Sequence, residues 1–372
     1  MPTTVTLRNG ELHIAATGAT PAGAFPLNNS QTIMLKSDNA DDRIALGETA
    51  GRLRTYQGQI TLQSRSSHSL EAIETVPLEE YLRGVVPSEI GADAPAQAQY
   101  AQAVAARSFS VLMLRGRGHK KHNYDICSTV HCQAYSGLTR TNSATDQAVS
   151  ATRGLILTFG GKAIPAYYAA LCGGHTEEIR HIWPVRSTEN AYTGTARFDG
   201  PQQLSYDLTK DADFRKYLKD KPIAYCNPEQ FKVLEWAGRN YRWHREFTAE
   251  EVTKFVAEKK NIGRVLAIKP GQRGQSGRYN AATFVGEKGT FTVDSEIELR
   301  RLFEPALRSG AITIDTSGTL QRPTHFMIDG AGSGHAVGMC QTGAMGMANA
   351  GKTFREILKH YYPKAEIQQL AD

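Results

Sequence analysis

The sequence lacks any run of about 20 apolar residues, the length that a helix needs to cross a membrane. Residues 1–18 also lack the basic and apolar segments that together mark a secretory leader. Lysines and arginines are scattered rather than gathered into a run, although the net charge is +6 and the isoelectric point is about 9.0. We therefore expect no membrane span in this chain, and an anionic partner other than nucleic acid.

Cysteine is also scarce. The odd, sparse set does not form a disulfide framework, and at least one thiol must be free or metal-bound if the chain is monomeric. The cysteines are Cys127, Cys132, Cys172, Cys226 and Cys340.

The 372 residues, 40% hydrophobic and 22% charged, suit one large or two moderate globular domains. We expect an α+β fold in which a helical catalytic core and antiparallel β elements surround a single cleft. Residues 1–70 form the predicted β-rich N-terminal region, beginning with a hairpin at Asn9-Gly10. Residues 71–372 form the predicted catalytic domain, with residues 195–320 as an elaborating α+β subregion.

Local patterns predict further elements. Strands are expected at residues 31–36, 52–64 and 70–76, at 155–174 around a Gly160-Gly161 turn, and in a hairpin at 265–293. Helices are expected at residues 141–154, capped by Asn142 or Ser143, at 248–259, at 295–304, capped by Ser295, and at 354–363.

Residues 76–107 organise the chain. Pro77 suits the first position of a helix whose apolar face begins at Leu78 and Leu82. Pro87 is predicted to end this helix, because the residue before a proline is disfavoured in the α region.

A second, Ala-rich helix is predicted to begin near Asp93, with Pro95 in its first turn and Arg107 at its end. The loop at residues 87–91 would then carry Glu89, a carboxylate beside apolar neighbours. The alternative is that Glu89 is an ordinary solvated surface residue. Glu79 and Glu80 are the rival candidates for the catalytic carboxylate.

Residues 76–90 read VPLEEYLRGVVPSEI and residues 101–108 read AQAVAARS. Together with residues 127–137, 169–176 and 334–362, they resemble the SpoIID/LytB family, which comprises stage II sporulation protein D and amidase enhancers. The resemblance implies a lytic transglycosylase that cleaves peptidoglycan glycan strands between MurNAc and GlcNAc. It also implies an extracytoplasmic location, with a leader or anchor removed from this sequence. The alternative function is a non-catalytic wall-binding enhancer of an N-acetylmuramoyl-L-alanine amidase.

The catalytic acid of the family falls on Glu89. A single carboxyl can protonate the leaving oxygen and then accept the proton of the muramyl 6-hydroxyl, giving a 1,6-anhydro end. Such a group needs a pKa raised by apolar burial. Arg107 is expected either to bind the muramyl lactyl carboxylate or to form a structural ion pair.

The Gly-rich segment at residues 330–346 suits a sugar-binding floor, because glycine lets the backbone approach a ligand closely. His335 is expected to bind sugar hydroxyls or assist the acid, with core packing as the alternative. Gly334, Gly338 and Gln341 are the other expected substrate-binding residues. A phosphate-binding loop is disfavoured, since the Lys-Ser/Thr that should follow its glycines is absent.

The sequence differs from the family pattern at four positions. Ala336, Cys340 and Thr342 stand where the family pattern has Gly, Ser and Tyr, and Cys172 also stands in place of Ser. A thiol nucleophile at Cys172, with His175 as its base, is a further alternative.

His122, Cys127 and Cys132 lie in one loop with four residues between successive members. Two thiolates and an imidazole suit zinc, and the family resemblance implies a similar site in some members. We expect three protein ligands, an open fourth position, and a structural or positioning role for the ion. His131 and His119 are rival ligands, and a Cys127–Cys132 disulfide or free thiols are the alternatives.

Overall fold

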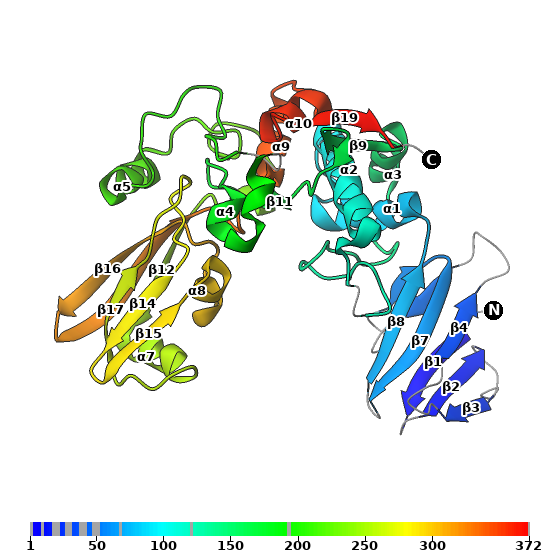
Figure 1. The fold of residues 1–372 in the computed structure, drawn as a ribbon, viewed down its shortest axis with the longest axis horizontal. Helices are drawn as coiled ribbons and strands as arrows, with labels where there is room; N and C mark the ends of the chain where they lie inside the picture. Colours follow the sequence, from blue (N-terminus) through cyan, green and yellow to red (C-terminus); the bar gives the residue numbers. More distant parts are fainter. Residues whose placement is uncertain are drawn as a thin grey trace. The chain divides into compact units, whose positions relative to one another are not determined.

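The computed structural model describes residues 3–8, 11–16, 23–26, 32–36, 43–46, 53–66, 69–119, 122–191 and 195–370 (Figure 1). Its helices and mainly antiparallel sheets confirm the predicted α+β class, and the strands before residue 70 confirm the β-rich N-terminal region. Among the described residues, every helix is too short or too polar to cross a lipid bilayer.

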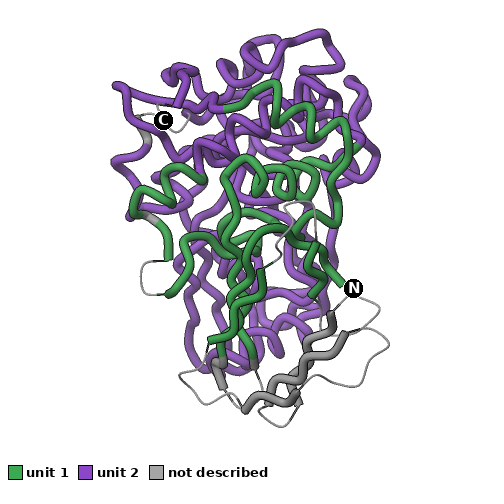
Figure 2. The backbone as a smooth tube through the Cα atoms, turned by 90° about the vertical axis from the view of Figure 1, so that its right-hand side faces the viewer, with its two compact units in different colours: residues 1–92, 110–153 green, residues 93–109, 154–372 purple. Residues whose placement is uncertain are grey.

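The chain divides into two compact units, each made from two segments of sequence (Figure 2). The first unit comprises residues 1–92 and 110–153, and the second comprises residues 93–109 and 154–372. The predicted division at residue 70 and the single cleft stay predictions.

Three small sheets build the β part of the first unit. β1 and β2 form the expected hairpin, with Arg8 opposite Glu11. Ile60 and Leu62 of β7 are buried under apolar residues of β4 and β8. The sheets have the orders β1-β2-β3, β4-β7-β8 and β5-β6. The strands are β1 (Thr3–Arg8), β2 (Glu11–Ala16), β3 (Gly23–Pro26), β4 (Thr32–Lys36), β5 (Ile44–Leu46), β6 (Arg54–Tyr56), β7 (Gln59–Ser66) and β8 (Ser69–Thr75).

Helix α1 (Leu78–Glu89) corrects the prediction that Pro87 ends it, because Pro87 lies inside the last turn. Val85, Val86 and Pro87 are all buried, and this burial outweighs the local preference against helix before a proline. The Ser88 hydroxyl also donates to the Gly84 carbonyl at 2.7 Å, so the last turn keeps a side-chain hydrogen bond. Glu89 is therefore a helix-terminal residue and not a loop residue.

Helix α3 (Ser143–Ala151) begins as predicted, because the Asn142 side chain accepts hydrogen bonds from the Ala144 and Thr145 N–H groups. It packs against α1 through Arg83. That guanidinium donates to both carboxylate oxygens of Asp146, at 2.9 and 2.7 Å.

Helix α2 (Ala96–Leu112) begins one residue after Pro95, whose carbonyl accepts from the N–H groups of the first turn. It continues five residues past Arg107 and leads into the π-helical turn η1 (Met113–Arg117), which corrects the predicted end. Five of its alanines are fully buried, as a close-packing helix requires. They are Ala98, Ala101, Ala103, Ala105 and Ala106.

Two three-stranded sheets and the helices α7 and α8 enclose one apolar core in the second unit (Figure 1). The sheets have the orders β12-β17-β16 and β13-β14-β15. Thr248 and Ser295 cap the two helices, Thr248 with a full capping box. The elements are β12 (Arg242–Thr248), α7 (Ala249–Ala257), β13 (Val265–Pro270), β14 (Ala282–Gly286), β15 (Gly289–Val293), α8 (Glu296–Leu302), β16 (Ile312–Thr319) and β17 (Arg322–Ala331).

The rest of the second unit contains the predicted turn at residues 160–161, between β9 and β10. A parallel pair of short strands, β11 and β18, joins segments about 170 residues apart. These elements are β9 (Leu155–Phe159), β10 (Lys162–Ala163), β11 (Tyr168–Ala169), α4 (Ile179–Ile182), η2 (Pro184–Ala191), α5 (Asp211–Asp220), α6 (Glu235–Gly238), β18 (Met339–Cys340), α9 (Gln341–Asn349), α10 (Phe354–Tyr361) and β19 (Glu366–Gln369).

Candidate functional site

Glu89 is half-buried at the end of α1, beside the fully buried Val86 and Ile90. Its Oε1 atom accepts a hydrogen bond of 2.5 Å from the backbone N–H of Ala134. Ala134 lies two residues after Cys132, so the structure joins the glutamate to the cysteine-containing loop. Sequence reasoning missed this contact, because a backbone donor leaves no residue-type signal.

Tyr81, one helical turn before Val85, also faces this region. Burial chiefly raises the pKa of its hydroxyl, and the charges of Cys132, Glu89 and Cys127 raise it further, while a hydrogen bond from Gln133 opposes them. The Gln133 amide donates to the Tyr81 hydroxyl at 3.3 Å. Glu89, Tyr81 and both cysteines are therefore near enough to interact within the first unit.

Four ligand-type side chains gather in this loop: His119, Cys127, His131 and Cys132. Their donor atoms all lie within 4.8 Å of one another. His119 Nε2 is 3.2 Å from Cys132 Sγ, and His131 Nδ1 is 3.5 Å from Cys132 Sγ and 3.7 Å from Cys127 Sγ. A tetrahedral zinc ion would separate its sulfur and nitrogen ligands by about 3.5 Å, so the donor set fits zinc.

His122 does not belong to this group, which corrects the predicted ligand set. The His122 N–H donates to the His119 carbonyl at 2.7 Å, closing a turn, and the exposed His122 ring stacks on Tyr124. His119 therefore takes the place expected of His122. Even spacing along the sequence did not predict which imidazole faces the thiols, because the loop turns back on itself.

The two thiols of this loop differ in acidity. Burial raises the pKa of the Cys132 thiol to about 11. Burial also acts to raise the pKa of Cys127, but hydrogen bonds from the side chain and backbone of Thr129 outweigh it and hold that pKa at about 6. Both cysteines are free thiols in the structure, so the predicted disulfide alternative is not formed there.

Arg107 lies in the second unit and is fully buried. Its guanidinium donates to the Leu155 carbonyl at 3.2 Å, which ties α2 to β9. This position favours the structural alternative over contact with a substrate carboxylate.

His335 also lies in the second unit, where its Nδ1 atom accepts a hydrogen bond of 3.0 Å from the Val337 N–H. The ring packs against Trp183, with 4.8 Å between ring centroids. Burial lowers the pKa of His335 to about 3, and the positive charges of Arg278 and Arg300 add to this effect. The imidazole is therefore neutral near pH 7, but its side chain is only half-buried, so sugar binding and core packing both stay open for His335.

The predicted substrate-binding residues Gly334, Gly338 and Gln341 are engaged by the protein itself. Gly338 has a φ of +74°, and a Cβ atom there would lie 1.9 Å from the Tyr167 carbonyl oxygen. The Gly334 N–H donates to the Arg308 carbonyl at 3.0 Å, and the buried Gln341 amide donates to Gln102 at 3.2 Å. Close backbone packing thus explains the glycine at position 338 without a ligand, and a φ of +92° explains the glycine at position 334. Whether Glu89 and His335 share a site stays a prediction.

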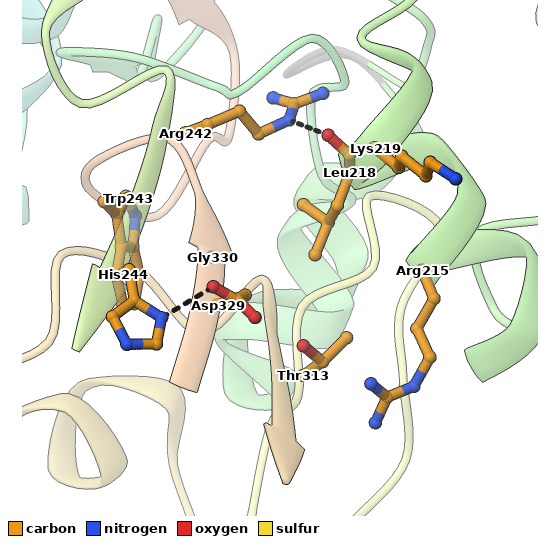
Figure 3. Close-up of a pocket in the computed structure, with 9 residues that line it drawn as sticks. All are labelled: Arg215, Leu218, Lys219, Arg242, Trp243, His244, Thr313, Asp329 and Gly330. Atoms are coloured by element: carbon orange, nitrogen blue, oxygen red, sulfur yellow. Dashed lines mark hydrogen bonds and ion pairs between the residues drawn. The ribbon is translucent and has the colours of Figure 1, made fainter. Parts of the chain in front are cut away.

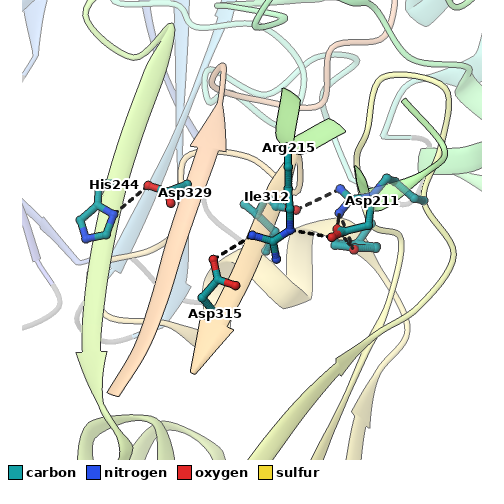
Figure 4. A network of polar contacts seen from close by, with 8 residues as sticks. Asp211, Arg215, His244, Ile312, Asp315 and Asp329 are labelled. Carbon is teal, nitrogen blue, oxygen red and sulfur yellow. Dashed lines mark hydrogen bonds and ion pairs between the residues drawn. The ribbon is translucent and has the colours of Figure 1, made fainter. Parts of the chain in front are cut away.

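A groove of about 470 Å³ lies elsewhere in the second unit, beside β12 and β17 (Figure 3). It is lined by Arg215, Leu218, Lys219, Arg242, Trp243, His244, Thr313, Asp329 and Gly330. Arg215 already binds Asp211 and Asp315, and His244 binds Asp329 at 2.8 Å (Figure 4). Arg215 and His244 are thus already paired with carboxylates, and we assign the groove no part in glycan chemistry.

Cys172 contacts Asp199 and Cys226 and not the imidazole of His175, whose Nδ1 atom is 2.7 Å from the Thr176 carbonyl. The structure therefore gives no support to the thiol–imidazole pair. Sequence reasoning also missed that Cys172, Cys226 and Cys340 meet at Asp199.

Comparison with known proteins shows which family and which relatives the chain resembles. The family model described as Stage II sporulation protein matches residues 66–159, and a domain of unknown function (DUF8618) matches residues 178–338. The chain is 30% identical over 298 residues to the amidase enhancer of Bacillus subtilis, covering 76% of this chain and 39% of the enhancer. It is 27% identical to the stage II sporulation protein D of Bacillus amyloliquefaciens, covering 82% and 77% of the two chains. An uncharacterized protein of Brachyspira hyodysenteriae is 29% identical, with 79% and 67% covered.

Proposed function

Because the chain belongs to the SpoIID/LytB family, we propose that it is a lytic transglycosylase that cleaves the MurNAc–GlcNAc bonds of peptidoglycan glycan strands. We propose that it acts outside the cytoplasm, where peptidoglycan lies. The observation that carries this proposal is the position of Glu89, half-buried and bound through Oε1 to the Ala134 N–H.

Glu89 would act twice in the reaction. Its carboxyl group first gives a proton to the glycosidic oxygen as the bond to the anomeric carbon breaks. The resulting carboxylate then takes the proton of the muramyl 6-hydroxyl as that oxygen attacks the same carbon, which closes the 1,6-anhydro ring. The Ala134 N–H can only donate to Oε1, so this contact favours the other carboxyl oxygen as the carrier of the proton.

We also propose that zinc binds the loop through His119, Cys127, His131 and Cys132. When bound, the ion would supply a structural crosslink, because four protein donors complete a tetrahedral shell. In this proposal a fourth protein ligand takes the coordination position that is expected from the sequence to be open. Fixing Cys132 would hold Ala134 two residues later, and with it the N–H that orients Glu89.

The second candidate function is that of a non-catalytic enhancer of an amidase, working in contact with the wall. A relative named amidase enhancer, noted above, favours this candidate. The two functions differ in one requirement, since only the enzyme needs the proton of Glu89.

Incubation of the purified chain with peptide-free glycan strands, followed by mass spectrometry, tests the proposed reaction. Anhydro-muramyl ends should accumulate with time. Reducing ends formed by water, or intact strands after long incubation, would contradict it. If the strands stay intact while the chain accelerates an added amidase on intact wall, the enhancer function replaces the enzyme.

A further inference from the structure

A second cluster of metal-ligating side chains lies in the core of the second unit. It consists of Cys172, Asp199, Cys226 and Cys340, whose ligand atoms all lie within 4.8 Å of one another. Each of the four residues is at most 2% exposed. We propose that this cluster is a structural zinc site with three thiolate ligands and one carboxylate.

The spacing of the donors suits a tetrahedral ion. Cys172 Sγ lies 3.6 Å from Cys226 Sγ and 3.3 Å from Asp199 Oδ2. Zinc ligated tetrahedrally at ordinary bond lengths separates two sulfurs by about 3.8 Å, and a sulfur and an oxygen by about 3.6 Å. Small shifts of side chains are therefore enough to place an ion between the donors.

The surroundings of the sulfurs suit thiolates. The Cys172 and Gly343 N–H groups point at Cys340 Sγ, at 3.2 and 3.3 Å. The Gly174 N–H points at Cys172 Sγ at 3.4 Å. Backbone donors of this kind stabilise negative sulfur, and metal sites commonly orient their ligands through such outer contacts.

The carboxylate is oriented in the same way. Asp199 Oδ1 accepts from the Tyr361 hydroxyl at 2.8 Å and lies 3.3 Å from His360 Nε2. This leaves Oδ2 directed at the sulfurs. A Cβ atom on Gly343 would lie 2.4 Å from Oδ2, so a glycine is needed for the carboxylate to sit there.

The sequence supports the same conclusion. Cys172 and Cys340 are the two motif positions at which this chain has cysteine where the family pattern has serine. The structure brings both to one point, together with Cys226. Replacing an alcohol by a thiol at both positions changes weak zinc ligands into strong ones, and this explains why the two departures occur together.

The site would be structural because it is closed. All four ligands come from the protein, none is exposed, and they belong to segments far apart in the sequence. Cys172 follows β11, Cys340 ends β18 and caps α9, and the other two lie in the connections before and after α5. The ion would therefore crosslink the parallel β11–β18 pair to these connections, independently of the function proposed for Glu89.

Zinc content of the full chain, purified without chelator, tests the proposal. A Cys127→Ser, Cys132→Ser variant removes the thiols of the other cluster and should keep about one zinc ion per chain. Adding Cys340→Ser should remove that ion. Serine is the residue of the family pattern at position 340, so this variant is expected to fold, and circular dichroism checks that it does. Replacing zinc by Co²⁺ in the first variant should give thiolate-to-cobalt absorption that disappears with Cys340→Ser.

Two results would overturn the proposal. The first is a folded Cys127→Ser, Cys132→Ser protein that holds no zinc when Zn²⁺ is supplied and its thiols are reduced. The second is a tryptic peptide pair joined by a Cys172–Cys226 disulfide in protein that was purified anaerobically. If Cys340→Ser fails to fold, Cys226→Ser gives the same comparison, with Cys127→Ser as the matched control that leaves this cluster intact.

Discussion

The Oε1 atom of Glu89 lies 2.5 Å from the backbone nitrogen of Ala134, which follows Cys132 by two residues. Through this contact, a helix end and a cysteine-containing loop position one carboxyl group together. The relationship links the proposed zinc site to the proposed catalytic acid, and each can be tested separately.

Replacing His119 by alanine should weaken zinc binding at the loop, because its Nε2 atom lies 3.2 Å from Cys132 Sγ. Loss of one ligand or its support commonly costs about 10- to 100-fold in metal affinity. Competition with a chromophoric chelator measures the change. His122→Ala is the matched control, since that exposed ring lies outside the cluster. Equal losses in the two variants would show that the ligand set is wrong.

His335 should make the protein less stable in mild acid. Its pKa of about 3 in the folded protein lies below its ordinary value of 6.5, so the unfolded chain binds a proton that the folded chain does not. The contribution of His335 to the free energy of unfolding is therefore intact above pH 6.5. Below that pH the free energy of unfolding falls by up to about 1.4 kcal/mol per pH unit. Urea unfolding at pH 7, 6 and 5 measures this loss.

The comparison for that experiment is His335→Asn, which keeps an acceptor for the Val337 N–H but does not titrate. Its free energy of unfolding should fall less steeply between pH 6.5 and 5 than that of the parent. Parallel curves would mean that His335 is not buried in its neutral form.

Much of the local structure follows from the sequence, because caps and turns depend on neighbouring residues. Asn142, Thr248 and Ser295 all begin helices in the predicted positions. Pro87 was predicted wrongly, since core burial outweighs a local preference, and no local pattern shows burial. The two cysteine clusters also differ in whether neighbouring residues could predict them. The first lies within one loop and its thiols could be found from spacing, whereas the second joins segments up to 168 residues apart.

The contact between α1 and α3 should contribute modestly to stability. Arg83 holds both oxygens of Asp146, but the two side chains are 33% and 26% exposed, so solvent weakens the pair. Asp146→Asn should lower the free energy of unfolding by about 1 kcal/mol. Glu80→Gln, which removes only the single contact of Glu80 with Arg83, should cost less. A larger effect for Glu80→Gln would contradict this assignment.

Gly343→Ala should disturb the buried cluster of the second unit. The added methyl group would lie 2.2 Å from the Tyr361 hydroxyl and 2.4 Å from Asp199 Oδ2, and both belong to the cluster or its support. Overpacking of this kind typically costs about 1–3 kcal/mol. Thermal unfolding and zinc content should both fall, and a variant with full stability and full zinc would show that the carboxylate is not a ligand.

The central claim is that Glu89 carries the proton that cleaves the glycan. Glu89→Gln keeps the size of the side chain and its acceptor for the Ala134 N–H, but it removes the transferable proton. The measurement is the rate at which anhydro-muramyl ends form from peptide-free glycan strands, with Glu79→Gln on the same helix as the control. The account predicts that Glu89→Gln folds normally, binds zinc normally and forms no anhydro ends above background, while Glu79→Gln retains the parent rate. Anhydro ends formed by Glu89→Gln at the parent rate would contradict it.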